Sequence, residues 1–118
     1  MISIKKVPVF IESAGLFDVD YKIFVIARDG VCYTFDRDSE PRVLFTLSTH
    51  AVGFVKNGAH LFVACTDDTL HIYDDAGRIK HIRRTKGRPL AICELDVKDK
   101  GITGVLVSTS ESVIQIFR

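Results

Sequence analysis

The sequence contains no tryptophan, one methionine, three prolines and three cysteines among its 118 residues. The odd number of cysteines, and their positions inside apolar strand patterns at Cys32, Cys65 and Cys93, argue against a disulfide framework. Reduced, buried thiols in an intracellular protein explain this number of cysteines and their positions better. Long apolar runs are also missing, since a run such as Ile23–Ala27 is far too short to span a bilayer.

A dominant charge of one sign is absent too. Sixteen Lys and Arg stand against fifteen Asp and Glu, which gives a net charge of +1. No global field therefore draws the chain to nucleic acid or anionic lipid, and such a partner would need a local patch. The N-terminus lacks the apolar core and cleavage site of a secretory signal, so we expect a cytoplasmic protein.

What the chain does contain is one hairpin pattern in three copies. Ile23–Asp36, Leu61–Asp74 and Leu106–Phe117 each have an apolar strand, a short turn with an acid, and a strand that ends in or beside an aromatic residue. Repeats of roughly 40 residues with such strands are typical of β-propeller blades. We predict an all-β, partial propeller of about three four-stranded, WD40-like antiparallel blades, the last without its outer strand.

The blades are predicted over residues 7–47, 51–84 and 90–118, with no domain boundary inside the chain. Asp29-Gly30 is predicted to form a two-residue type I′ turn, and Asn57-Gly58 a second tight turn. A two-sheet sandwich is the alternative, but it should alternate more cleanly between polar and apolar residues than Ile23–Ala27 does. The predicted strands are Val7–Ile11, Tyr21–Arg28, Val31–Asp36 and Arg42–Leu47 in the first blade, Ala51–Lys56, His60–Cys65, Thr69–Tyr73 and Arg78–Arg83 in the second, and Leu90–Val97, Ile102–Val107 and Val113–Phe117 in the third.

An acid recurs at the turn between the second and third strands of each blade, as Asp29, Asp67 and Glu111. A carboxylate there can accept backbone N–H bonds and hold the turn. Because the acids lie in separate blades, we interpret them as structural turn acids rather than as one acidic site. His50, just before the second blade, is a candidate partner for such an acid.

The segment from Arg78 to Arg88 is basic and contains no acid. One interpretation is an outer strand whose charges discourage pairing with other chains. The other is a docking site for an acidic protein surface or anionic headgroups. No aromatic residue is interleaved for base stacking, so nucleic acid is not expected as a partner. The candidate docking residues are Arg78, Lys80, Arg83, Arg84, Lys86 and Arg88.

No residue pattern predicts catalysis, a cofactor or a metal. The histidines have no partner at the spacing of a zinc motif, and no glycine-rich loop opens a helix to hold phosphate. An enzyme built on a propeller would gather charged residues on its inner strands, which here are mostly apolar. We therefore expect no catalytic residues, no cofactor-binding residues and no metal ligands.

The segment 7–40 resembles the propeller of the Bardet-Biedl syndrome 1 subunit family of the BBSome, a ciliary membrane-protein coat complex. The motifs that carry this resemblance are Val7-Pro8-Val9-Phe10, Gly15, Phe17-Asp18-Val19, Asp29-Gly30 and Arg37-Asp38-Ser39, continued by Ala51-Val52-Gly53, Asp67-Asp68-Thr69-Leu70-His71 and Gly77.

This resemblance implies a non-catalytic scaffold near the N-terminus of a longer subunit. It implies other BBSome subunits as partners, and a GTP-bound Arf-like small GTPase docked through the full propeller. It further implies a cytoplasmic location at the cilium or basal body. The alternatives are a WD40-like adaptor of another trafficking complex and a fragment of a propeller enzyme.

Three blades would leave open sheet faces. Ile2-Ser3-Ile4-Lys5 alternates like a strand and could complete the third blade of a second copy. A homodimer that closes a ring by such an exchange is therefore a hypothesis from the sequence.

Overall fold

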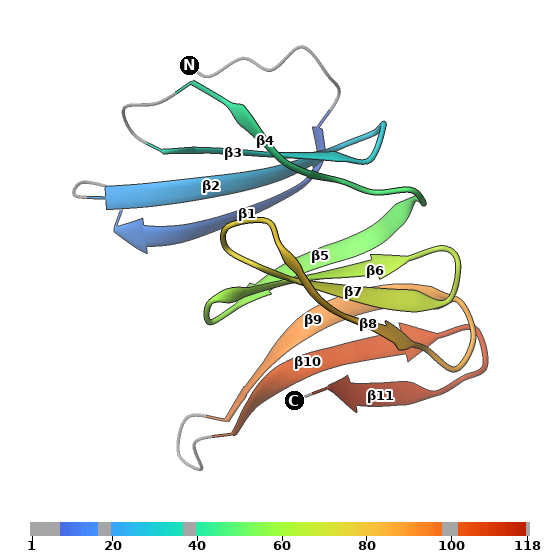
Figure 1. Cartoon of the computed structure of the whole chain (residues 1–118). Coiled ribbons are helices and arrows are strands. Elements are labelled where there is room, and N and C mark those ends of the chain that lie inside the picture. The colour runs from blue at the N-terminus through green and yellow to red at the C-terminus, as the bar shows by residue number, and fades with distance from the viewer. Residues whose placement is uncertain (1–7, 17–19, 37–39, 98–101, 118) are drawn as a thin grey trace. The chain divides into compact units, whose positions relative to one another are not determined.

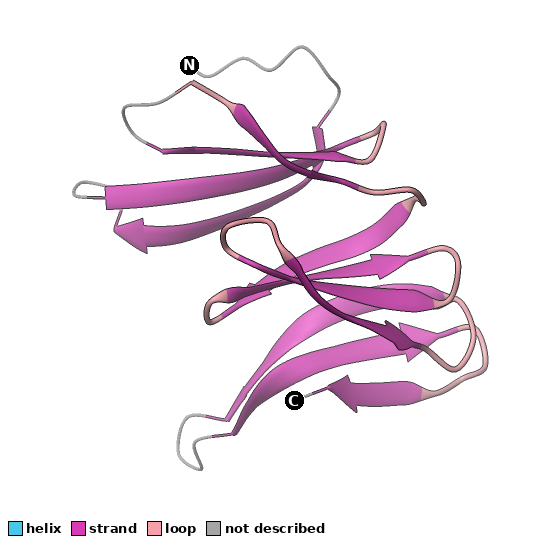
Figure 2. Ribbon diagram, viewed as in Figure 1, coloured by secondary structure: helices cyan, strands magenta, loops and turns pink. Residues whose placement is uncertain are grey.

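The computed structural model describes residues 8–16, 20–36, 40–97 and 102–117, and every regular element in these ranges is a β-strand (Figures 1 and 2). The chain forms two compact units, residues 1–50 and 51–118. The spare strand expected at Ile2–Lys5 lies outside the described residues.

The first unit holds one four-stranded antiparallel sheet in chain order. Its strands are β1 (Pro8–Leu16), β2 (Asp20–Ala27), β3 (Val31–Asp36) and β4 (Arg42–Thr46). Phe24, Val25, Ile26 and Ala27 are buried in succession along β2. Adjacent residues of a strand point to opposite faces of the sheet. Because four adjacent residues are buried, both faces of β2 are covered, as its continuous apolar run predicts.

The second unit holds two antiparallel sheets. The first contains β5 (Ala51–Asn57), β6 (His60–Cys65), β7 (Thr69–Asp74) and β8 (Ile79–Arg84) in chain order. The other contains β9 (Pro89–Val97), β10 (Ile102–Thr109) and β11 (Ile114–Phe117), with β10 in the middle. Sheets of four, four and three strands confirm the predicted fold class, including the short third sheet.

The main differences from the predicted strands lie at their ends. β1 continues to Leu16, five residues beyond the predicted end, because Ala14 and Gly15 pair with Lys22 and Tyr21 of β2. Small residues of this kind carry little strand signal in a sequence, and the partner strand decides their conformation.

The predicted type I′ turn at Asp29-Gly30 is wrong. Gly30 has φ of 86°, Asp29 does not have a positive φ, and the Gly30 N–H donates to the Ala27 carbonyl at 3.0 Å. This is a three-residue loop in which a type I turn is followed by a residue in the left-handed region. The second predicted turn is displaced by one residue, because Asn57 pairs with His60 and Gly58-Ala59 forms the loop.

The core of the second unit lies between its two sheets. Gly53 of β5 sits where a side chain would collide with β9, since a Cβ there would lie 2.3 Å from Ile92 Cγ2. Asn57 Nδ2 also donates to the Gly104 carbonyl at 2.8 Å and links the sheets at one end. The buried residues of this core are Val55, Ala64, Leu70, Ile72, Val105 and Val107.

Gly53→Ala should therefore destabilise the chain by about 1–3 kcal/mol, because the new methyl group overpacks the contact with Ile92. In an Ile92→Ala background the same change should cost less than about 0.5 kcal/mol, since the colliding methyl is gone. Urea unfolding of the four proteins in this double-mutant cycle measures both values. Equal costs in the two backgrounds would show that Ile92 does not set the requirement for glycine.

Candidate functional site

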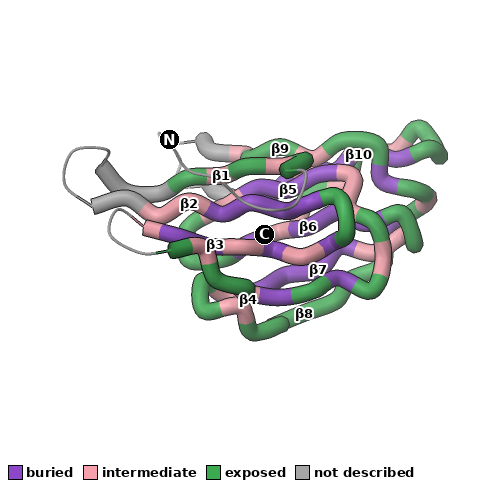
Figure 3. The backbone as a smooth tube through the Cα atoms, turned by 90° about the horizontal axis from the view of Figure 1, so that it is seen from above, coloured by how far each residue is buried: buried purple, intermediate pink, exposed green. Residues whose placement is uncertain are grey.

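The basic segment forms the outer strand β8 and the loop that follows it. All six residues of β8 are exposed (Figure 3). Arg83 pairs with the buried Leu70, whereas Arg84 pairs with Thr69. Since neighbours on a strand point to opposite faces, the two arginines do not belong to one surface. The structure thus divides the predicted docking residues between two faces and a loop.

Arg83 lies on the same face as His81 and contributes to a shallow pocket. The lining of this pocket combines imidazole and guanidinium groups with apolar and aromatic side chains, a combination suited to an acidic segment with an apolar residue. Its lining residues are His60, Phe62, Ile72, His81, Arg83 and Phe117.

At the start of the segment, the turn from β7 to β8 is organised by Asp74. Its Oδ1 accepts the N–H groups of Ala76 at 3.0 Å and Arg78 at 2.9 Å, and Lys80 Nζ lies 3.8 Å from its Oδ2. The Arg78 N–H bond is the main reason that the pKa of Asp74 lies below its ordinary value. The Lys80 side chain is thus partly engaged within its own hairpin.

At the other end, the loop with Lys86 and Arg88 is tied to the third sheet. The Lys86 N–H donates to Gln115 Oε1 at 2.6 Å, and the Arg88 N–H donates to Ser110 Oγ at 3.0 Å. The Arg88 carbonyl in turn accepts the Ser110 N–H at 2.9 Å. These backbone bonds hold the loop while both side chains stay exposed.

The three turn acids lie in three separate hairpins. Asp29 Oδ1 accepts the Val31 N–H at 3.2 Å, a contact of the expected kind, and Asp67 Oδ1 accepts the Thr69 hydroxyl. Glu111 is exposed and lies against Gly87, where a Cβ would stand 2.5 Å from Glu111 Cγ. A shared structural role for the three acids stays a prediction. His50 is exposed.

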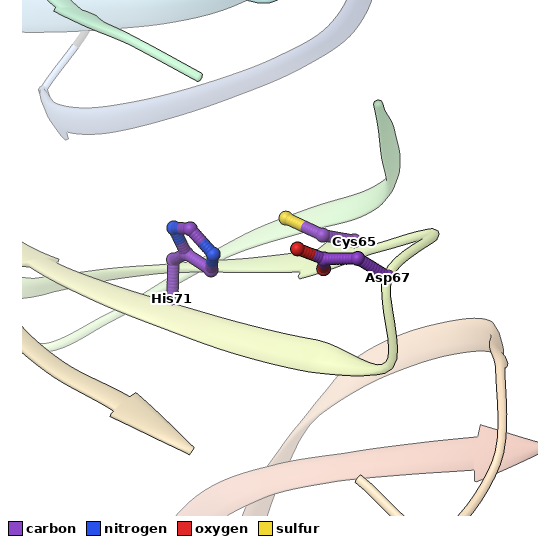
Figure 4. A group of neighbouring side chains, drawn as sticks. All are labelled: Cys65, Asp67 and His71. Carbon is purple, nitrogen blue, oxygen red and sulfur yellow. The ribbon is translucent and has the colours of Figure 1, made fainter. Parts of the chain in front are cut away.

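Sequence reasoning missed a cluster of Cys65, Asp67 and His71 (Figure 4). One potential ligand atom from each residue lies within 4.8 Å of those of the other two. Cys65 pairs with Thr69, and His71 with Val63, so strand pairing puts the thiol and the imidazole on one face of the sheet. Asp67 reaches them from the turn. The missed signal was the register of this hairpin, which a search for zinc-motif spacings does not consider.

Burial sets the ionisation of the cluster. It raises the pKa of Cys65 to about 12, and it lowers the pKa of His71. Near neutral pH the thiol therefore keeps its proton, and the imidazole is mostly neutral. A neutral imidazole is the form that binds metals.

The third sheet has an exposed apolar face. Ile114 is 70% exposed and Ile116 is 55% exposed, and both pair with β10 on this side. Cys93 is exposed on the same face, which corrects the expectation that all three thiols are buried. The apolar groove on this face is lined by Ala91, Ile92, Cys93, Leu106, Ser108 and Ile114. Nowhere in the described ranges does the chain form a helix long and apolar enough to cross a bilayer.

Comparisons with known proteins agree with the resemblance seen in the sequence. The family described as ciliary BBSome complex subunit 1 matches residues 1–36. The BBSome complex members BBS1 of Mus musculus and of Homo sapiens are each 29% identical to the chain over 118 residues. These matches cover 99% of the chain and 20% of each relative, so the chain spans about a fifth of their length.

Solved structures extend the match to the fold. A crystal structure of BBS1N in complex with ARL6DN has a TM-score of 0.89 and 25% identity, over 98% of this chain and 38% of that one. The designed Ika4 protein, with a TM-score of 0.62 and 12% identity over 81% of this chain and 59% of its own, shares the fold alone. The resemblance to the BBSome subunit 1 propeller is confirmed.

The low pKa of Asp74 predicts how the hairpin responds to acid. A carboxyl whose pKa is lowered by folding contributes stability above its unfolded pKa, near 3.8, and this contribution is lost as the pH falls through the folded value. An NMR titration should place the Asp74 carboxyl below 3.8. Asp74→Asn should remove the part of the acid destabilisation that comes from this carboxyl. A carboxyl that titrates at or above 3.8 would contradict this account.

Proposed function

We propose that this chain is the propeller part of a BBSome-type subunit 1 and acts as a non-catalytic scaffold in ciliary membrane-protein trafficking. The observation that carries the proposal is the whole-chain match to BBS1N, with a TM-score of 0.89. Two further observations support it. The cations of β8 and its loop are exposed, and an apolar sheet face is uncovered.

The proposed partners are other BBSome subunits and a GTP-bound Arf-like small GTPase that docks through the full propeller. The similar BBS1N structure is a complex with ARL6, which supports a GTPase partner. The proposed location is cytoplasmic, at the cilium or basal body. Within the chain, the candidate docking surfaces for an acidic partner are the β8 face with Arg83, the opposite face with Arg84, and the Lys86–Arg88 loop.

We further propose that the chain is part of a longer parent protein, in which the exposed face of the third sheet packs against another blade. An apolar groove on a face that also exposes Ile114 and Ile116 is unusual on a free surface, and stacked sheets are how propeller blades bury such faces. The chain covers only part of the BBS1N propeller that it resembles, which supports this arrangement.

Ile116→Lys should have different effects in the isolated chain and in the parent protein. In the isolated chain this exposed substitution should change the free energy of unfolding by less than about 0.5 kcal/mol. In the parent protein it should lower the melting temperature and the yield of folded protein, because a charge would be buried between blades. Glu94→Lys, an exposed change on the other face of the same sheet, serves as the matched control. An unchanged parent protein would show that no blade covers this face.

Affinity capture of the tagged parent protein from ciliated cells tests the scaffold function. BBSome subunits should be captured, and an Arf-like GTPase should be retained with a non-hydrolysable GTP analogue but not with GDP. Arg83→Glu with Arg84→Glu, which changes both faces of β8, should weaken capture of the partner that binds there roughly tenfold, which corresponds to about 1.4 kcal/mol.

Arg28→Glu, an exposed reversal elsewhere, should leave capture intact. Arg83→Glu and Arg84→Glu, each made alone, then show which face of the sheet binds the partner. Capture of another trafficking complex without BBSome subunits would contradict the proposed function.

A further inference from the structure

The hairpin between β6 and β7 gathers a thiol, an imidazole and a carboxylate at one point (Figure 4). Cys65 is fully buried and His71 is 8% exposed, whereas Asp67 lies in the exposed turn. Sulfur and imidazole nitrogen with one carboxylate oxygen form a donor set that suits zinc and disfavours magnesium or calcium. We propose that Cys65, Asp67 and His71 bind one Zn²⁺ ion and close the turn of the second blade.

The separations are compatible with such a site after a small adjustment. Ligand atoms around tetrahedral zinc stand roughly 3.5 Å apart, given metal–ligand bonds of about 2.0–2.3 Å. The three atoms here lie within 4.8 Å of one another before any ion is added. Asp67 is the member that can move, because its side chain is exposed at the loop. The buried pair on the strands can stay in place.

The imidazole is already held in a suitable orientation. His71 Nε2 lies 3.1 Å from the Thr69 hydroxyl, and Nδ1 lies 3.4 Å from the Tyr73 hydroxyl. The Thr69 hydroxyl also donates to Asp67 Oδ1, so it occupies the space between the carboxylate and the imidazole. An ion bound by Nε2 and the carboxylate would take over this position, while Tyr73 holds the other nitrogen, as outer partners of metal-bound histidines do.

The charges balance when the ion binds. The Cys65 thiol loses its proton to solvent as the zinc–sulfur bond forms. One thiolate and one carboxylate then neutralise the two positive charges of the ion, and the neutral imidazole adds none. Water fills the fourth position from the exposed side of the turn. No charge is left unpaired in the buried part of the site.

Titration with Co²⁺, a spectroscopic substitute for zinc, tests the site in the purified chain. We expect one ion per chain and a near-ultraviolet thiolate-to-cobalt charge-transfer band that stoichiometric Zn²⁺ abolishes. Cys65→Ala should remove the band, and His71→Ala should weaken binding by more than about 100-fold. Cys93→Ser and His60→Ala change an exposed thiol and an exposed imidazole outside the cluster, so they should keep both the band and the affinity.

Two variants keep the test decisive if a buried substitution prevents folding. Asp67→Ala changes only an exposed turn residue and should also weaken binding, whereas Thr69→Ala should retain the ion because the hydroxyl is not a ligand. Zinc should raise the melting temperature of the native chain in a manner reversed by a chelator. The proposal is overturned if the band survives in Cys65→Ala, disappears in Cys93→Ser, or never forms, or if Asp67→Ala binds zinc like the native chain.

Discussion

The packing of one sheet face on another is the constraint on which the rest of this structure depends. A four-stranded sheet with apolar residues on both faces cannot bury them alone. In the second unit, β5 meets β9 closely because Gly53 has no side chain beside Ile92. The same need to cover apolar sheet faces explains the two candidate surfaces, the exposed face of the third sheet and the strand β8. A sheet face left without a neighbour exposes Ile114 and Ile116, and the edge strand β8, which pairs on one side only, carries charge.

The sequence predicts this fold well because its main signals are local. Apolar runs and turn residues repeat with each hairpin, and they therefore predict where each strand lies. The turn types could not be derived, since Asp29-Gly30 fits two loop geometries and only the backbone φ of Asp29 separates them. The sequence does not predict the length of β1 either, because pairing with β2 extends this strand through residues of low strand preference.

The candidate sites depend on positions across the strands, which a linear pattern does not contain. Arg83 and Arg84 are neighbours in the sequence, yet the pleat separates them onto two faces. Cys65 and His71 have no recognisable zinc spacing, yet the register of one hairpin puts them side by side. Both arrangements follow from the strand pairing, because it decides which side chains share a face of the sheet.

The left-handed residue in each hairpin loop has a consequence for how such repeats diverge. Gly30, Asp68 and Ser112 occupy equivalent positions with φ of 86°, 63° and 60°. Left-handed backbone costs roughly 1–2 kcal/mol for residues with a side chain, so the second and third loops keep their shape against an unfavourable conformation. The three loops therefore share a backbone geometry that their residue identities do not reveal. A glycine marks this position in one of the three loops, whereas a left-handed φ marks it in all three.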